Sequence, residues 1–340
     1  MPVLAPAFVT VNPSFTEPGL LLPYSQASGA FSLLAGGKPR ASLGEGDLAV
    51  YIKKIDLRTS VAANQAAANQ LPSLSAAFSQ ISTPTYLLRC RGEWDHHDAA
   101  ASDRWGAAIT EIQRLGMRQG IFQQMRGALL DGFRPAQGEG LLNVQGATAI
   151  NLPADSNGAT TLATYDNGEL AFFMISLVQA MKTRTNQMGK GVRFCFTGPQ
   201  RALGPMTYQD IVQLTQFQRV GAGTANTKEL LESVLSSNGD QLDWCYDDTL
   251  QGKGAGGADA IILTMPEVEK PSNSGPNTNE FAKLAPGLDA TTLQYCDMAA
   301  PREITSPLAG GAIDQLSELR VTSGWGVRPQ AVTVLSAFSS

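Results

Sequence analysis

The sequence is poor in the side chains that form most metal sites and catalytic centres. It contains two histidines and four cysteines in 340 residues. The cysteines, Cys90, Cys195, Cys245 and Cys296, are far apart in the chain and show no paired metal-ligand spacing. The first residues also lack the positively charged segment of a secretory signal. We therefore expect reduced, buried thiols in a cytosolic setting rather than disulfides or a zinc site.

The two histidines stand side by side at His96 and His97, within the acidic stretch 93–98. Adjacent residues point to opposite faces of a strand and lie about 100° apart on a helix, so they cannot jointly bind one ion without an unusual turn. We interpret the stretch as a junction between a strand and a helix, whose carboxylates favour the positive N-terminus of that helix. A metal site, or a hydrolase that uses these histidines, is the alternative.

An excess of basic residues, a nucleotide-binding motif and a long apolar run are also missing. The formal net charge is −5, which argues against a protein that grips nucleic acid through a basic face. The glycine-rich stretch 252–257 lacks the Lys-Ser/Thr ending of a phosphate-binding loop, so we interpret it as a flexible loop. The longest apolar run, 170–181, is too short to cross a bilayer, and we expect a soluble protein.

Residues 1–37 carry one charged side chain, Glu17, and prolines at positions 2, 6, 13, 18 and 23. Such prolines forbid a long helix and favour extended or turn conformations. Ordinary disordered tails differ, because they are charged and poor in apolar residues. We therefore expect an arm that lies along another surface, either its own body or a neighbouring subunit. The arm residues expected at a contact between subunits are Phe8, Phe15, Leu21 and Tyr24.

Two strand-like runs, 48–58 and 83–94, mix charged residues with β-branched and aromatic ones in partial alternation. We expect them to pair as a long antiparallel hairpin. Residues 60–82 between them are small and polar, with Leu71, Leu74 and Phe78 as isolated anchors. A hairpin with so little core is marginal alone, so these anchors are expected to be buried against a neighbouring subunit.

The stretch 98–133 predicts one long helix, spanning roughly 45 Å. Ser102 or Asp103 can cap its start, and Gly132 and Pro135 supply its end. Apolar residues recur at intervals of three and four, at Ala108, Ile112, Leu115, Phe122, Met125, Leu129 and Phe133.

The opposite face of this predicted helix carries Arg114, Arg118 and Arg126, which are either solvated or paired with carboxylates of a neighbouring subunit. Glycines at 106, 116, 120 and 127 each weaken a helix by about 1 kcal/mol relative to alanine. We expect the close approach of other backbone to compensate.

The rest of the pattern predicts a mixed α/β region. The apolar stripe 170–181 and the stretch 229–235 predict helices, while 147–152, 192–197, 242–246 and 260–264 predict strands. The stretch 316–335 predicts two strands around a glycine-rich turn.

Several motifs stand out along the chain. They are Gly-Glu-Gly-Asp-Leu at 44–48, Glu-Trp-Asp-His-His-Asp at 93–98, Arg-Leu-Gly-Met-Arg-Gln-Gly-Ile-Phe at 114–122, Gly-Glu-Gly-Leu-Leu-Asn at 138–143 and Ser-Gly-Trp-Gly-Val at 323–327. With these motifs, and with its order of arm, hairpin, long helix, mixed domain and returning strands, the chain resembles the major capsid protein of tailed bacteriophages, which has the Hong Kong 97-type fold.

The resemblance implies an α+β fold made of segments with different roles. These are an N-terminal arm at 1–45, an extended hairpin (E-loop) with peripheral strands at 46–95, the spine helix of a peripheral domain at 96–139, an axial domain at 140–300, and returning peripheral and axial strands at 301–340.

The same resemblance implies a structural protein rather than an enzyme, with no cofactor and no metal. It would assemble as hexamers and pentamers into an icosahedral shell, in the cytoplasm of a bacterial host, and enclose double-stranded DNA without sequence-specific binding. The implied partners are further copies of itself, a portal, and scaffolding or decoration proteins, with no membrane; its place is the virion. The alternatives are an encapsulin-like nanocompartment shell protein enclosing protein cargo and, in a different class, the hydrolase named above.

Overall fold

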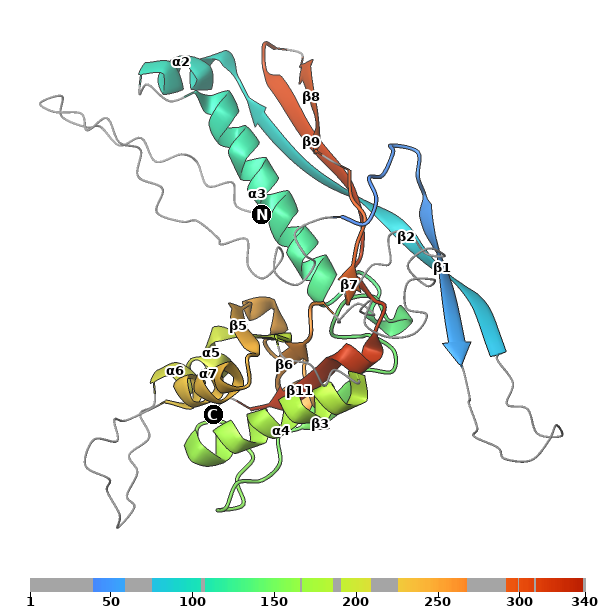
Figure 1. The fold of residues 1–340 in the computed structure, drawn as a ribbon. Coiled ribbons are helices and arrows are strands. Elements are labelled where there is room, and N and C mark those ends of the chain that lie inside the picture. The colour runs from blue at the N-terminus through green and yellow to red at the C-terminus, as the bar shows by residue number, and fades with distance from the viewer. Residues whose placement is uncertain are drawn as a thin grey trace, which may run out of the picture.

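The computed structural model describes residues 39–58, 75–104, 108–165, 167–185, 191–208, 226–267, 292–298, 300–308 and 310–338. These residues form a four-stranded sheet, a five-stranded sheet and a two-stranded pair, with helices packed between and around them (Figure 1). The expectation of a mixed α and β chain is confirmed. Within the described part of the chain, no helix is both long and apolar enough to span a membrane.

The four-stranded sheet has the order β1-β2-β9-β8, formed by β1 (Ala49–Arg58), β2 (Ser75–Trp94), β9 (Ile313–Thr322) and β8 (Arg302–Pro307). Its register differs from the predicted hairpin. β1 pairs with the first half of β2, so that Arg58 lies opposite Ser75, while the second half of β2 pairs with β9.

The prediction of an antiparallel hairpin is therefore confirmed, but its register was wrong, because 75–82 was assigned to the hairpin tip. The small and polar side chains of this stretch do not prevent a strand, since the ladder is made by backbone groups.

Two helices occupy the stretch that predicted one. They are α2 (His96–Arg104) and α3 (Ile109–Leu130), and Figure 1 shows α2 set at an angle across the start of α3. The 22 residues of α3 span roughly 33 Å rather than the predicted 45 Å. Ser102 does act at a helix start, but its Oγ accepts a hydrogen bond from the N–H of Ile109 at 3.2 Å and so serves α3.

The predicted apolar stripe of α3 is buried only near the C-terminal end of the helix. Met125 and Leu129 are buried, as predicted, and the helix packs on β2 and β9. Ile112, Leu115 and Phe122, however, are 49%, 63% and 47% exposed, so the prediction was wrong for these three residues. The helix instead turns another face toward the sheets, on which Met117 and Ile121 are buried.

The expected compensation for the α3 glycines is also not found. Among the described residues, no atom lies within 4 Å of a Cβ placed on Gly116, Gly120 or Gly127. These glycines therefore weaken the helix without allowing a close contact within the described part of this chain.

The five-stranded sheet has the order β3-β11-β6-β4-β5 and is buried on both faces. Its strands, which match the predicted ones, are β3 (Thr148–Asn151), β11 (Val332–Ala337), β6 (Asp259–Thr264), β4 (Arg193–Gly198) and β5 (Gln241–Tyr246). In β6, Ile261 and Leu263 face one core while Ala260 and Ile262 face the other. Burial on both faces explains why this strand is a continuous apolar run.

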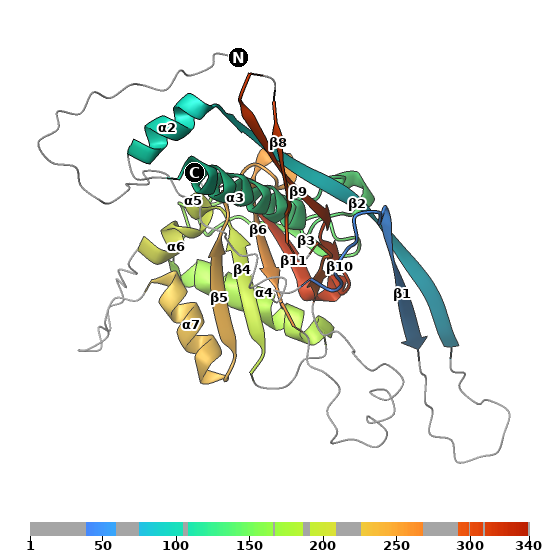
Figure 2. The same ribbon diagram turned by 90° about the horizontal axis from the view of Figure 1, so that it is seen from above.

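One core lies under α4 (Asn167–Thr185) and α7 (Thr227–Ser237). The predicted stripe on α4 is confirmed, since Met174, Val178 and Met181 are completely buried. The second core joins the two large sheets, because the C-terminal half of α3 packs there together with β6, β9 and β11. Figures 1 and 2 show α3 and α4 on opposite sides of the five-stranded sheet.

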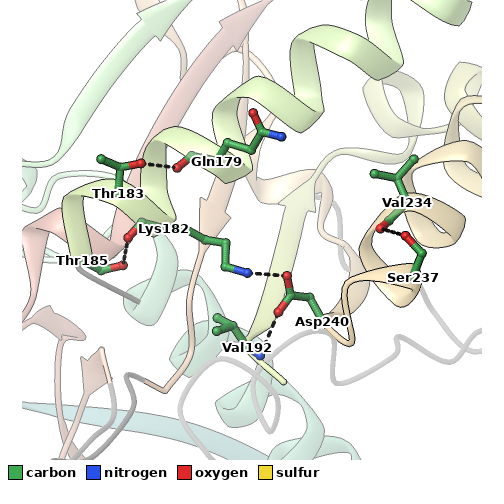
Figure 3. A network of polar contacts seen from close by, with 8 residues as sticks. All are labelled: Gln179, Lys182, Thr183, Thr185, Val192, Val234, Ser237 and Asp240. Atoms are coloured by element: carbon green, nitrogen blue, oxygen red, sulfur yellow. Dashed lines mark hydrogen bonds and ion pairs between the residues drawn. The ribbon is translucent and has the colours of Figure 1, made fainter. Parts of the chain in front are cut away.

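A buried carboxylate fixes α4 to this sheet (Figure 3). Lys182 Nζ donates to Asp240 Oδ2 at 2.5 Å, and the N–H of Val192 donates to Asp240 Oδ1 at 3.1 Å. The carboxylate of Asp240 thus connects the helix, the start of β4 and the turn after α7.

The remaining elements are short. They are β7 (Leu293–Gln294), β10 (Trp325–Gly326), α5 (Gln200–Leu203), α6 (Pro205–Tyr208) and the 3-10 helices η1 (Pro135–Gln137), η2 (Asp248–Leu250), η3 (Ala255–Gly257) and η4 (Pro329–Ala331).

Candidate functional site

The His96-His97 stretch is a helix cap. Asp95 Oδ1 accepts hydrogen bonds from the N–H groups of His97 and Asp98 at 2.7 and 2.9 Å, and Asp98 Oδ2 accepts from the N–H of Asp95 at 3.3 Å. The hydrogen bond with Asp98 is the largest cause of the lowered pKa of Asp95, and the hydrogen bond with His97 lowers it further. The predicted junction between a strand and a helix is confirmed, and its carboxylates are engaged in capping. In the described parts of the chain, no group of three or more His, Cys, Asp or Glu residues is placed to hold a metal ion.

The glycine-rich stretch 252–257 is a hydrogen-bonded turn, so the expectation of a loop is confirmed, and its flexibility stays a prediction. The N–H of Gly252 donates to Asp259 Oδ1 at 3.0 Å, and the N–H of Ala255 donates to Ser336 Oγ at 2.9 Å. Backbone donors that a phosphate-binding loop would present to a ligand are here bound within the chain.

The cysteines are free thiols, as predicted, and three of the four are buried. The sequence did not predict that Cys195 and Cys245 would meet, with their sulfurs 3.4 Å apart on the adjacent strands β4 and β5. The hydrogen bond to Cys245, together with burial, raises the pKa of Cys195 far above its ordinary value. Complete burial and a raised pKa are typical of a structural thiol.

The arginines of α3 bind carboxylates of the same chain. Arg114 and Arg118 both pair with Glu303 on β8, at 2.9 and 2.8 Å. Burial alone would raise the pKa of Glu303, but the two guanidinium groups hold it below its ordinary value. Arg126 pairs with Asp247 at 2.9 Å. All three thus have partners within the chain, and their contact with a neighbouring subunit stays a prediction.

The other residues expected at contacts between subunits cannot be placed. Phe8, Phe15, Leu21, Tyr24, Leu71 and Leu74 lie outside the described residues, and Phe78 is described through its backbone alone, opposite Ile55 in the β1-β2 ladder.

Two of the motifs found in the sequence meet at the end of α3. The N–H of Gly140, in the motif 138–143, donates to the carbonyl of Gly324, in the motif 323–327, at 2.7 Å. A Cβ on Gly324 would lie 2.8 Å from the carbonyl oxygen of Leu129, and Gly140 has a φ of +86°. Glycine is therefore required at both positions, at Gly140 by its positive φ and at both by the close approach of the backbone at the end of α3.

A buried carboxylate, Glu139, connects the segments that meet there. It accepts hydrogen bonds from the Tyr86 hydroxyl at 2.8 Å, the Ser323 hydroxyl at 2.7 Å and the N–H of Arg134 at 3.0 Å. The pKa of Tyr86 is raised to about 12, mainly by burial and secondly by its hydrogen bond to Glu139. The junction between the two large sheets is thus a satisfied polar network, which favours one arrangement of the segments.

A cavity of about 300 Å³ opens beside this network, between the root of the hairpin and the 323–329 turn. The described surface also exposes apolar side chains, among them Ile112, Leu115 and Phe122 on α3, Phe172 on α4, and Leu48 and Tyr51 at the root of the hairpin. Sequence reasoning missed the α3 group, because its spacing is that of an ordinary core-facing stripe.

Comparison with known proteins gives no sequence relative: no protein-family profile and no curated protein matches the chain. Its fold, however, is similar to that of solved phage capsids. The capsid protein of Myoviridae phage XM1 has a TM-score of 0.63 at 10% identity, over 95% of this chain and 96% of that chain. The capsid of an empty GTA particle has a TM-score of 0.58 at 11% identity, over 96% of this chain and 95% of that chain. The capsid of cyanophage P-SCSP1u has a TM-score of 0.57 at 12% identity, over 98% of this chain and 94% of that chain. The chain therefore has the fold of phage capsid proteins, as the resemblance of its sequence implied.

Proposed function

We propose that this chain is a major capsid protein of a tailed bacteriophage, whose activity is self-assembly into an icosahedral shell. The observation that carries the proposal is the fold shared with a phage capsid protein over 95% of this chain. The geometry of the described surface supports it in two further ways.

The first support is the β1-β2 ribbon. Figure 1 shows β1 and the first half of β2 extending away from the five-stranded sheet. In the described part of this sheet, β1 pairs with β2 alone. A ribbon of two strands is marginal in water, and its free edge invites another chain. Contact with a neighbouring subunit would stabilise it.

The second support is the exposed apolar face of α3. Full burial of a leucine, isoleucine or phenylalanine contributes about 1.5–3 kcal/mol. Ile112, Leu115 and Phe122 are about half exposed, so covering them would add about 2–5 kcal/mol per subunit. In a shell this modest contribution is repeated at every copy, so the contacts between subunits together stabilise the assembled particle.

In this proposal α3 is the spine helix of a peripheral domain, the β1-β2 ribbon is the E-loop, and the five-stranded sheet belongs to the axial domain. Since β11 is a strand of that sheet, the axial domain takes residues 332–337 in addition to 140–300. Hexamers and pentamers form in the bacterial cytoplasm and enclose double-stranded DNA, with a portal and with scaffolding or decoration proteins as partners. A net charge of −5 suits a container that does not hold its DNA tightly.

Sedimentation of the purified protein, followed by nuclease treatment, tests the proposal. We expect particles far heavier than a 36.0 kDa monomer, which protect double-stranded DNA from the nuclease when they are produced with a portal and a packaging motor. Particles that contain a fixed protein cargo and no protected DNA would instead favour a nanocompartment shell. Protein that stays monomeric under all assembly conditions would contradict both.

A further inference from the structure

Two of the four cysteines of the chain meet in the core that joins the two large sheets. Cys195 on β4 and Cys245 on β5 are 50 positions apart, yet their sulfurs lie 3.4 Å from each other. In the register of these parallel strands Cys245 lies opposite Thr197, two residues beyond Cys195, so the cysteines are diagonal neighbours. A disulfide bond is about 2 Å long, so bond formation requires the two sulfurs to approach by about 1.4 Å.

The position of β5 in the sheet allows this approach. β5 is an edge strand, and within the described part of the chain its one ladder is the pairing with β4. A central strand is held by two ladders, so a small shift of an edge strand disturbs fewer backbone hydrogen bonds. Cys245 is also the next-to-last residue of β5, where the strand leads into η2.

The two thiols differ in access and in acidity. Cys245 is 8% exposed, whereas Cys195 is completely buried. The S–H of Cys195 donates to the sulfur of Cys245, and this hydrogen bond lowers the pKa of Cys245 while it raises the pKa of Cys195. The thiolate is the nucleophile in thiol–disulfide exchange. Cys245 is therefore placed to react first with an oxidant, and Cys195 to complete the bond.

We propose that Cys195 and Cys245 form a redox pair, which a small disulfide reagent converts into a disulfide bond between β4 and β5. The Cys245 thiolate first attacks one sulfur of the reagent, which gives a mixed disulfide and releases one thiolate. The Cys195 sulfur then attacks the Cys245 sulfur, and the bond to the reagent breaks. The pair loses two electrons and two protons, which reduce one molecule of the reagent to two thiols.

The new bond would close a loop that contains α5, α6 and α7, since its two cysteines are 50 positions apart. A crosslink of this length stabilises a protein mainly by restricting the unfolded chain. Under the proposed function, a released particle leaves the reducing cytoplasm, and an oxidising exterior would close the pair. The reaction itself requires no assembly, so it can be tested independently of the proposed function.

Peptide mapping under non-reducing conditions tests the bond. The unassembled full chain is treated in its folded state with hydroxyethyl disulfide. We expect a linked pair of peptides that contain Cys195 and Cys245, and the return of both free thiols after treatment with dithiothreitol. No link in the folded protein, a link that involves Cys90 or Cys296 instead, or a mixed disulfide that persists at Cys245 would overturn the proposal.

Thermal unfolding tests the effect of the bond. The oxidised protein should have a Tm about 3–10 °C above that of the reduced protein. Cys245→Ala should show no such difference between its own oxidised and reduced samples, whereas the matched control Cys90→Ala should keep it. Each comparison is made within one variant, so a general loss of stability does not affect it. If Cys245→Ala does not fold, the wild-type peptide map decides.

Two results would overturn the stabilising role of the bond. One is an unchanged Tm of wild-type protein in which the link between Cys195 and Cys245 has formed. The other is an equal rise of the Tm in Cys245→Ala, which would assign the effect to another site.

Discussion

Arg126 on α3 forms a 2.9 Å ion pair with Asp247, whose side chain is completely buried at the end of β5. Asp247 Oδ1 also accepts hydrogen bonds from the N–H and the hydroxyl of Thr249, at 3.1 and 2.7 Å. The pair connects the helix that lies along the four-stranded sheet to the rim of the five-stranded sheet. The relative position of the two sheets thus depends on a buried charge in addition to the shared apolar core.

Arg126→Ala should lower the free energy of unfolding by about 3–5 kcal/mol, because it leaves the Asp247 carboxylate buried without its cation. Arg114→Ala is the matched control on the same helix. The Arg114 side chain is 39% exposed in its pair with Glu303. Loss of this pair should therefore lower the free energy of unfolding by less than about 1 kcal/mol. Urea denaturation of the unassembled variants measures both. Equal effects would contradict a special role for the buried pair.

Replacing the helix glycines should stabilise α3. Gly116→Ala and Gly120→Ala should each raise the free energy of unfolding by about 1 kcal/mol, since a Cβ at either position meets no described atom within 4 Å. Gly324→Ala is the opposite case and should destabilise, because its Cβ would lie 2.8 Å from the Leu129 carbonyl oxygen. A loss of stability at 116 or 120 would contradict the open space around these two positions.

The exposed face of α3 should matter for assembly and not for folding. Leu115→Ser with Phe122→Ser should change the stability of the unassembled protein by less than about 1 kcal/mol. The concentration required for assembly should rise about tenfold or more, as expected for about 1.4 kcal/mol lost at a contact. Met125→Ser, on the buried face of the same helix, should instead cost at least about 2 kcal/mol of folding stability. Normal assembly of the Leu115 and Phe122 variant would contradict the proposed contact.

Asp297 should make stability depend on pH. Burial raises its pKa to about 6 in the folded protein, and its Oδ1 has no hydrogen-bond donor among the described residues. An unfolded aspartate has a pKa of about 4, so from pH 4 to 6 the folded state holds a proton that the unfolded state has lost. This group therefore contributes stability that is present below pH 4 and is lost as the pH rises through 6, by up to about 3 kcal/mol.

Chemical denaturation from pH 4 to 7 measures this effect as a difference between the wild type and Asp297→Asn, because other carboxylates, such as Glu303, have lowered pKa values and give the opposite slope. The advantage of the Asn variant should grow as the pH rises. Parallel stability curves would show that Asp297 is ionised freely in the folded protein.

The sequence was most informative where one physical effect controls the pattern. The α4 stripe and the apolar run of β6 were predicted correctly, because each is set by burial. The stripe on α3 has the same spacing, yet Leu115 is exposed, because the helix buries the face that carries Met117 and Ile121 instead. Periodicity along one segment cannot report what lies on the segment beneath it.

The junction could not be predicted for a related reason. Glu139 and Ser323 are 184 positions apart in the chain, and both lie in motifs that were noticed without any sign that they meet. The N-cap at Asp95 was accessible to sequence reasoning, because all of its partners lie within three residues. Hydrogen bonds between near neighbours in the chain can be predicted from the sequence. The contacts of Glu139 with Ser323 and of Gly140 with Gly324 join distant segments and leave no such pattern.

Electron cryo-microscopy of the assembled protein tests the central claim most directly. We predict closed shells with five-fold and six-fold capsomers, in which each β1-β2 ribbon lies on a neighbouring subunit and the Leu115 and Phe122 side chains are covered at a contact. A protein that remains a monomer or a small oligomer under all assembly conditions, or shells in which the ribbon lies on its own subunit and this face of α3 stays in solvent, would contradict the account.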